Sequence, residues 1–270
     1  MAAAPHIVWM IMFIVAPMLF VLYFAFTETS DSGKVVFTFS NIASLSQYTN
    51  VFILSIAFAL IATVICLLIG YPLAYFMSRT TPKMQKILMV LIMLPMWCNL
   101  LIRTYALMAL LDNGGLLNSF LESLGLDKLY IVGSDAGVIL GMVYDFLPYM
   151  VLPIFTTMSK LDKKYIEAAH DLGCSSWQTM TKVIMPLTVS GVISGVTMVF
   201  VPSISTFFIS KSLSDGRIKL IGDVIETQIS MHNVAAYNIG SALSFVLMVL
   251  VMFSLYFTNK FGDSEGGVMV

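Results

Sequence analysis

The sequence predicts an all-α, polytopic membrane protein with about six transmembrane helices, and two observations support this fold class. The composition is 59% hydrophobic and only 11% charged, with a mean hydropathy of +0.92. Such a chain is too apolar for a soluble globular domain. Long apolar runs also recur along the sequence, and a membrane-spanning helix needs about 20 apolar residues. We therefore expect one transmembrane domain, residues 1–270, with no appended soluble domain.

Six apolar segments have the length of a membrane span, and we expect a helix in each. In chain order they are 7–26, 51–77, 87–111, 136–157, 187–209 and 239–258. The first segment lacks the basic region of a signal peptide, and its apolar run is too long for one, so we expect it to be retained. The fifth segment contains Pro202 among serines, in VPSISTFFIS, and this stretch could break or bend the helix.

The charged residues between the segments predict the orientation. Most of the basic residues lie in one alternating set of loops, around 79–86 and 158–185, and in the tail after 259. They are Arg79, Lys83, Lys86, Lys160, Lys163, Lys164, Lys182 and Lys260. Because basic loops stay in the cytoplasm, this set and both termini are predicted to be cytoplasmic. The basic residues at 211–219, in an opposite loop, oppose this assignment.

A polar insert at 160–186, KLDKKYIEAAHDLGCSSWQTMTKVIMP, interrupts the apolar sequence. Ser159 and Asp162 have the spacing of a capping box, which predicts a helix beginning near Lys160. Gly173 is placed to end that helix, because glycine adopts the left-handed conformation at little cost. The residues predicted to share one apolar helical face are Leu161, Tyr165, Ala168 or Ala169, and Leu172.

A second helix is predicted after the glycine. Ser175 and Gln178 form another capping box, and the helix opened there runs toward Met185. Pro186 then stands at the start of the next membrane span. The insert is thus predicted to be a short helix, a sharp turn and a second helix.

The residues alone leave two interpretations of the insert open. It could be an amphipathic connector on the membrane surface, with the lysines near its start at anionic lipid heads. It could also be a docking helix for a cytosolic partner. Ala168 and Ala169 would allow close approach, Glu167 would offer a charge to a basic partner, and Gly173 would fix the exit angle.

The insert resembles the EAA loop of permease subunits in ATP-binding-cassette (ABC) importers. That motif is EAA, three residues, Gly, nine residues, then two aliphatic residues one apart and Pro. Here it is formed by Glu167, Ala168, Ala169, Gly173, Val183, Met185 and Pro186. Val183 and Met185 replace the usual Ile and Leu, which are conservative changes. LPMWCNLLIRTYALMALLDNGGLLN, YDFLPYMVLPIF and EAAHDLGCSSWQTMTKVIMPLTVSG are similar in particular to PotB-type permeases of spermidine/putrescine importers.

This resemblance covers most of the chain and implies a MetI-like, type I ABC importer fold. The loop at about 158–186 would be a coupling helix that sits in a cleft of an ATPase subunit. Rigid-body motion of two permeases would then give alternating access. The residues implied to couple to the ATPase are Glu167, Ala168, Ala169, Leu172, Gly173 and Pro186.

The resemblance also implies the partners and the location of the chain. The partners would be a cytosolic ABC ATPase dimer that uses ATP and Mg²⁺, an extracytoplasmic binding protein and a second, PotC-like permease. The location would be the bacterial cytoplasmic (inner) membrane. The chain contains no G-x-x-x-x-G-K-[ST] motif, so it cannot itself be a P-loop ATPase. The resemblance implies a non-catalytic subunit, in which we expect no catalytic residue, no cofactor and no metal site. A net charge of −1 gives no reason to expect nucleic acid.

Two ionisable residues lie inside apolar segments, Arg103 and Asp145. Such charges are costly in a bilayer and face protein or water. They could pair with each other. Alternatively, Asp145 with Tyr144 and Tyr149 could pass a cationic solute such as a polyamine, because carboxylates and aromatic faces attract ammonium groups. Weaker candidates for the same path are Trp97, Tyr105 and Glu226.

Three other functions are alternatives. The chain could be an ABC importer permease for another small solute, or a secondary transporter driven by an ion gradient. A membrane enzyme is the third, because Glu167 and His170 have the Glu-x-x-His spacing of di-iron bundles, although only one copy is present. The separated Cys66, Cys98 and Cys174 predict neither disulfides nor a metal site.

Overall fold

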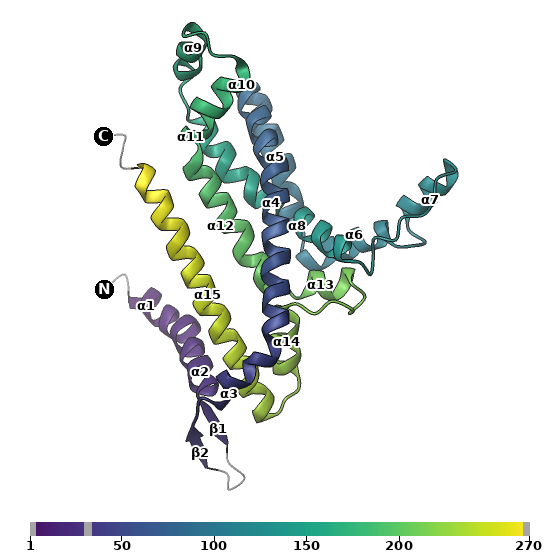
Figure 1. Ribbon diagram of the computed structural model, residues 1–270, viewed down its shortest axis with the longest axis vertical. Coiled ribbons are helices and arrows are strands. Elements are labelled where there is room, and N and C mark those ends of the chain that lie inside the picture. Colours follow the sequence, from purple (N-terminus) through teal and green to yellow (C-terminus); the bar gives the residue numbers. More distant parts are fainter. Residues whose placement is uncertain (1–3, 30–33, 267–270) are drawn as a thin grey trace.

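The computed structural model describes residues 4–29 and 34–266, so residues 1–3, 30–33 and 267–270 of the predicted domain lie outside the described residues. Almost all of the described chain is helical (Figure 1). Two short antiparallel strands, β1 (Thr27–Thr29) and β2 (Val35–Phe37), lie at one end of the molecule, where Thr27 pairs with Phe37. The all-α membrane fold expected from the composition is confirmed.

Three long helices form the centre of the bundle: α4 (Thr49–Arg79), α8 (Asp135–Ser159) and α12 (Val189–Ser205). Their contact surfaces hold buried apolar side chains such as Met142 and Met150. Gly195 of α12 lies directly against α8, because a Cβ at this position would be 2.8 Å from Met150 Sδ. Small residues let membrane helices approach closely, and this glycine does so for α12.

A second layer lies beside this centre. Helices α1 (Ala4–Met10), η1 (Ile11–Val15) and α2 (Ala16–Ala25) form a continuous first span that packs on α15 (Val234–Gly266). The outer side of this span exposes large apolar side chains, as expected for a surface that lipid covers. Helix α3 (Ser40–Ala43) and the 3₁₀ turn η2 (Ser44–Tyr48) connect it to α4.

Five helices in the described chain are long and apolar enough to cross a membrane, and a bent helix pair gives a sixth span if it counts as one. The third predicted segment, 87–111, is wrong as a single helix. The chain forms α5 (Pro82–Trp97) and α6 (Leu100–Leu111), with a break at Cys98 and Asn99. The break has a local cause: the Asn99 side chain accepts a hydrogen bond from Leu101 N at 2.8 Å and so caps a new helix.

The fifth predicted segment, 187–209, also differs from the structure. Helix α12 continues through Pro202 and ends at Ser205, so the expected break lies three residues after the proline, among the serines that follow it. The next helix, α13 (Phe208–Leu213), begins after Thr206. The sharp bend lies at the other end, where the helices on either side of Thr188 differ in direction by 68°.

Outside the polar insert, the helices that remain are α7 (Leu116–Ser123) and α14 (Ile221–Ser230). Helices α6 and α7 project together from the side of the bundle as an arm (Figure 1). Helix α14 packs against α15. The close approach of α14 to the end of α12 requires Gly222, because a Cβ there would lie 2.5 Å from the carbonyl oxygen of Ser205.

Candidate functional site

The first helix of the polar insert begins later than predicted. Helix α8 continues to Ser159, and the first helix of the insert, α9 (Lys164–Asp171), begins at Lys164 rather than near Lys160. The predicted capping box at Ser159 is wrong, because its hydroxyl donates back to Thr156 O within α8. Asp162 instead satisfies a free backbone N–H at the start of α9, since its carboxylate accepts a hydrogen bond from Lys164 N at 3.0 Å.

The turn and the second helix are as predicted. Gly173 has a φ of +80°, the left-handed conformation that ends α9. The Ser175 hydroxyl accepts from Gln178 N, and the Gln178 side chain accepts from Ser175 N at 2.9 Å, so this capping box is confirmed. Helices α10 (Ser176–Thr179), η3 (Met180–Ile184) and α11 (Met185–Leu187) then run into α12. Pro186 lies in α11, just before α12 begins.

The residues predicted to share one apolar face of the first insert helix do not all lie on the same side of α9. Ala169 is buried and Ile166 is half-buried, whereas Ala168 and Tyr165 are exposed. Leu172 is 85% exposed. Helix α9 stands at the tip of the bundle, beyond the ends of the long helices (Figure 1). Its outer face therefore exposes apolar side chains such as Leu172. Exposed apolar patches mark interaction surfaces, with either a protein or a membrane.

Two further side chains of the insert are also accessible. Glu167 is exposed beside Ala168, and Trp177 of α10 is 75% exposed. His170 turns back toward its own loop, with Nδ1 3.3 Å from Cys174 O. Among the described residues, no three His, Cys, Asp or Glu side chains gather as a possible metal site.

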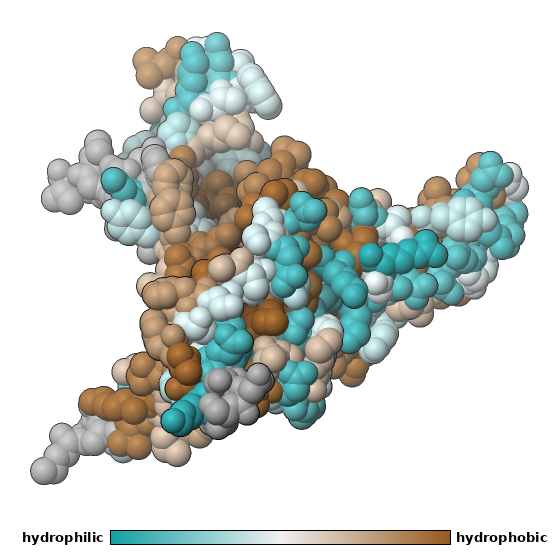
Figure 2. All heavy atoms as spheres, turned by 60° about the horizontal axis from the view of Figure 1, so that its bottom comes forward, coloured by the Kyte–Doolittle hydropathy of each residue, from teal (hydrophilic) through white to brown (hydrophobic). Residues whose placement is uncertain are grey.

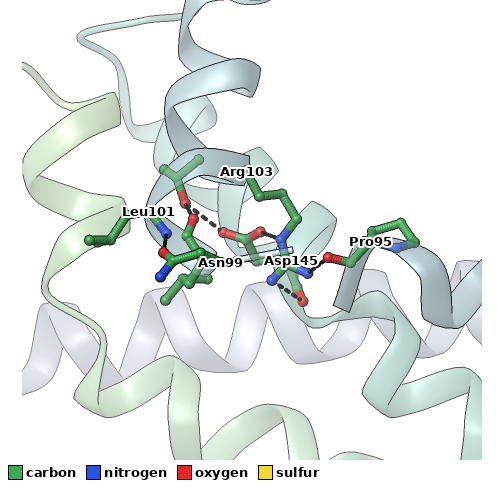
Figure 3. A network of polar contacts seen from close by, with 7 residues as sticks. Pro95, Asn99, Leu101, Arg103 and Asp145 are labelled. Carbon is green, nitrogen blue, oxygen red and sulfur yellow. Dashed lines mark hydrogen bonds and ion pairs between the residues drawn. The ribbon is translucent and has the colours of Figure 1, made fainter. Parts of the chain in front are cut away.

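Arg103 of α6 and Asp145 of α8 form a buried ion pair (Figure 3). Arg103 Nε donates to Asp145 Oδ1, and the Thr104 hydroxyl donates to Asp145 Oδ2 at 3.0 Å. The guanidinium also donates to Pro95 O, in the last turn of α5, at 3.0 Å. The side chains are only 7% and 0% exposed. The network therefore holds the break between α5 and α6 against α8. Of the two interpretations of these charges, the structure shows the one in which Arg103 and Asp145 pair with each other.

The other residues predicted for a solute path are distributed over several places. The Arg103 guanidinium lies 5.9 Å from the centre of the Tyr144 ring, so Tyr144 belongs to the same network. Tyr149 packs beside Phe146, and Trp97 is exposed at the end of α5. The Asp145 carboxylate is fully buried, whereas the Trp97 side chain is 73% exposed.

Tyr105 and Glu226, in contrast, line one cavity of about 520 Å³ between α6, α13 and α14. The residues of its wall that the sequence reasoning missed include Phe208, Lys211 and Asp215. The available signal was the position of Lys211 and Asp215 directly after the apolar run of the fifth segment. Their approach to Tyr105 depends on packing between distant helices, which no local pattern reveals.

Comparison with known proteins identifies the family. Residues 70–260 match the family described as binding-protein-dependent transport system inner membrane component. The chain is 37% identical to the spermidine/putrescine transport system permease protein PotB of Haemophilus influenzae, over 93% of this chain and 91% of that protein. The PotB protein of Escherichia coli K12 is also 37% identical, over 90% of both chains. The Escherichia coli inner membrane ABC transporter permease protein YdcU is 27% identical over 89% of this chain and 81% of that protein.

Solved structures share the fold. A bacterial ABC transporter that imports the acidic polysaccharide alginate has a chain with a TM-score of 0.72 and 20% identity, covering 95% of this chain and 93% of that one. The alginate transporter in complex with its pentasaccharide-bound periplasmic protein gives a TM-score of 0.73 at 19% identity, covering 96% and 93%. These matches confirm the importer-permease fold that the EAA loop implied. The chain therefore belongs to the family of binding-protein-dependent transport system inner membrane components, the membrane-spanning permeases of ABC importers.

Proposed function

We propose that this chain is the permease subunit that passes polyamines, spermidine or putrescine, through an ATP-driven importer. The observation that carries the proposal is the 37% identity to PotB permeases over about nine-tenths of both chains. The chain itself is a transport subunit rather than an enzyme. Because it lacks a P-loop, ATP and Mg²⁺ would be bound by a separate ATPase.

The outer face of α9 is the proposed contact with that ATPase. Leu172 and Tyr165 would pack into a cleft of the partner, and Glu167 would pair with a basic residue there. Movement of α9 would pass through α10, η3 and α11 into α12, which packs on α4 and α8. The central helices would then move as one body when the ATPase subunits close, which gives alternating access. The proposed coupling residues are Glu167, Ala168, Ala169, Leu172, Gly173 and Pro186.

The remaining partners follow from the family. A binding protein delivers solute to permeases of this family, and we place it at the end of the bundle remote from α9. A second, PotC-like permease would complete the translocation path. In the inner membrane, α9 and both termini would face the cytoplasm, in agreement with the basic loops. The direction of the helices agrees, since α1 and the end of α15 both point toward the end that carries α9 (Figure 1).

Uptake by the complete complex in proteoliposomes tests the cargo. Labelled spermidine should accumulate only with ATP, the ATPase and the binding protein, and unlabelled putrescine should compete while neutral polyols should not. Uptake that polyamines do not inhibit would refute the polyamine assignment. Uptake without the ATPase, driven by an ion gradient, would instead support a secondary transporter.

A charge reversal on α9 tests the coupling surface. Glu167→Lys should abolish co-purification of the ATPase and ATP-dependent uptake, because it places a cation against the proposed basic cleft. Glu122→Lys is the matched control, since Glu122 is an exposed glutamate on α7, away from α9. Equal retention of the ATPase by both variants would show that α9 is not the contact.

A further inference from the structure

The cavity between α6, α13 and α14 lies at the end of the bundle remote from α9. Gly133 N, just before α8, donates to Leu213 O of α13 at 2.7 Å, and Ile221 N of α14 donates to the Ser55 hydroxyl near the start of α4 at 2.8 Å. Helix α9 comes after the C-terminal end of α8, at the opposite end of the bundle. Figure 2 brings the remote end forward and shows hydrophilic residues gathered over it. The cavity is thus placed on the side where solute would be delivered.

One wall of the cavity is aromatic. The rings of Tyr105 and Phe208 meet edge to face, with centroids 5.1 Å apart and an interplanar angle of 88°. Phe207 adds a third ring, half exposed. Aromatic faces attract ammonium groups and also pack against the methylene chain between them. The cavity volume of about 520 Å³ is in the range of small-ligand sites.

The lining also includes two carboxylates, Glu226 of α14 and Asp215 in the turn after α13. The Ser230 hydroxyl donates to Glu226 Oε1 at 3.3 Å, which orients that carboxylate. Asp215 lies in the turn after α13 with a φ of +54°, a conformation that aspartate tolerates better than most residues. With Lys211 as the one cation of the lining, the cavity has a net charge of −1.

Lys211 makes a weak ion pair inside this cavity. Its Nζ lies 3.5 Å from Glu226 Oε2, and the two side chains are 62% and 34% exposed. An ion pair with this distance and this solvent exposure is weak, because water competes for both charges. The lysine ammonium is also the same chemical group that a polyamine would bring. It can therefore leave Glu226 when an ammonium from solution arrives.

We propose that this cavity is a low-affinity subsite for an alkylammonium group, in which Lys211 occupies Glu226 at rest and the ammonium of the solute replaces it. A second ammonium of the same solute reaches Asp215, and the methylene chain lies on Tyr105 and Phe208. The identification of the solute as a polyamine rests on the proposed function. The subsite itself requires only an organic amine.

Calorimetry on the complete complex in nanodiscs, without binding protein, tests the subsite with putrescine and butylamine as probes. Glu226→Gln and Asp215→Asn should each weaken putrescine binding by about 5-fold, the effect of one partly exposed ion pair. Lys211→Met should strengthen it, because the internal competitor is gone. Glu122→Gln is the matched control, since Glu122 forms an exposed pair with Lys128 at 3.0 Å outside the cavity.

Each outcome decides one claim. Equal binding by Glu226→Gln and Glu122→Gln, or no binding of putrescine by the unmodified complex, would overturn the subsite. Weaker binding in Lys211→Met would also overturn it, because the lysine would then support the site instead of competing. Spermidine uptake that is normal in Glu226→Gln refutes the subsite alone. Glu226-dependent amine binding in a complex that imports no polyamine refutes the proposed function alone.

Discussion

Replacing Asp145 with Asn removes the charge that compensates Arg103 while keeping nearly the same shape. Arginine cannot lose its proton inside a protein, so the guanidinium stays charged and has only neutral acceptors: Pro95 O, the backbone carbonyl oxygen of residue 145 and the amide oxygen of the new asparagine. Both side chains are almost completely buried. Removal of one partner from a buried ion pair costs about 3–5 kcal/mol. At about 2–4 °C per kcal/mol for a chain of this size, the melting temperature should fall by roughly 6–20 °C.

The double variant Arg103→Met with Asp145→Asn separates a structural role from a solute contact. Without either charge the site contains no unpaired ion, and such replacements of buried pairs are often neutral. The melting temperature in nanodiscs should therefore return close to that of the unmodified protein. Spermidine uptake is then measured below the melting temperature of every variant. Normal uptake by the double variant would exclude Asp145 from direct solute contact, and specific loss of uptake would support the path prediction.

Two results would refute the reasoning about this network. The first is a melting temperature for Asp145→Asn within about 2 °C of the unmodified protein. Such a shift corresponds to a loss of less than about 1 kcal/mol in the free energy of unfolding for a chain of this size. The second is a double variant no more stable than either single variant. A matched neutral control is Glu122→Gln, which removes an exposed carboxylate and should leave the melting temperature unchanged within about 1 kcal/mol.

Three other predictions concern single residues. Gly173→Ala places a side chain at a φ of +80° and should destabilise the α9 turn by about 1–2 kcal/mol, seen as faster amide exchange there. Gly195→Ala should lower stability by about 1–3 kcal/mol, since its Cβ would lie 2.8 Å from Met150 Sδ, and the melting temperature measures this. Burial raises the pKa of the Asp223 carboxyl above its usual 3.8, so its contribution to stability is present at low pH and lost as pH rises through the raised value. Asp223→Asn should remove that loss in melting temperatures measured from pH 4 to 8.

Local patterns predicted some helix boundaries and misplaced others. Ser175 and Gln178 lie within one turn of each other, so their capping box depends only on sequence and was confirmed. The break at Cys98 also had a local signal, because Asn99 is a good N-cap residue before an apolar run, but the length of the run suggested one helix. At Ser159 the pattern failed because packing extends α8 to that residue, which overrides the weaker capping preference.

Contacts between distant helices could not be predicted from the sequence. Arg103 and Asp145 were recognisable as a possible pair only because charges are rare in apolar segments, and the role of Pro95 O in fixing the break was not visible. Asp223 stands between the fifth and sixth predicted segments, where no local pattern indicates that it is buried. It is buried because α14 folds under α13, where Ser210 donates to it at 2.6 Å. Among the described residues its second oxygen, Oδ1, has no hydrogen-bond partner.

The two acidic sites differ in how easily a passing cation could use them. At Asp145 a solute must displace an arginine that is buried and bonded to two helices, which would leave that arginine unpaired at a cost of about 3–5 kcal/mol. At Glu226 it must displace only a half-exposed lysine, a pair worth about 0–1 kcal/mol. A transporter needs sites that release what they bind. Arg103 and Tyr105 lie on the same helix, so α6 connects the Arg103–Asp145 ion pair to the proposed subsite at Glu226. A solute bound at Glu226 would therefore contact a helix that this ion pair holds against α5 and α8.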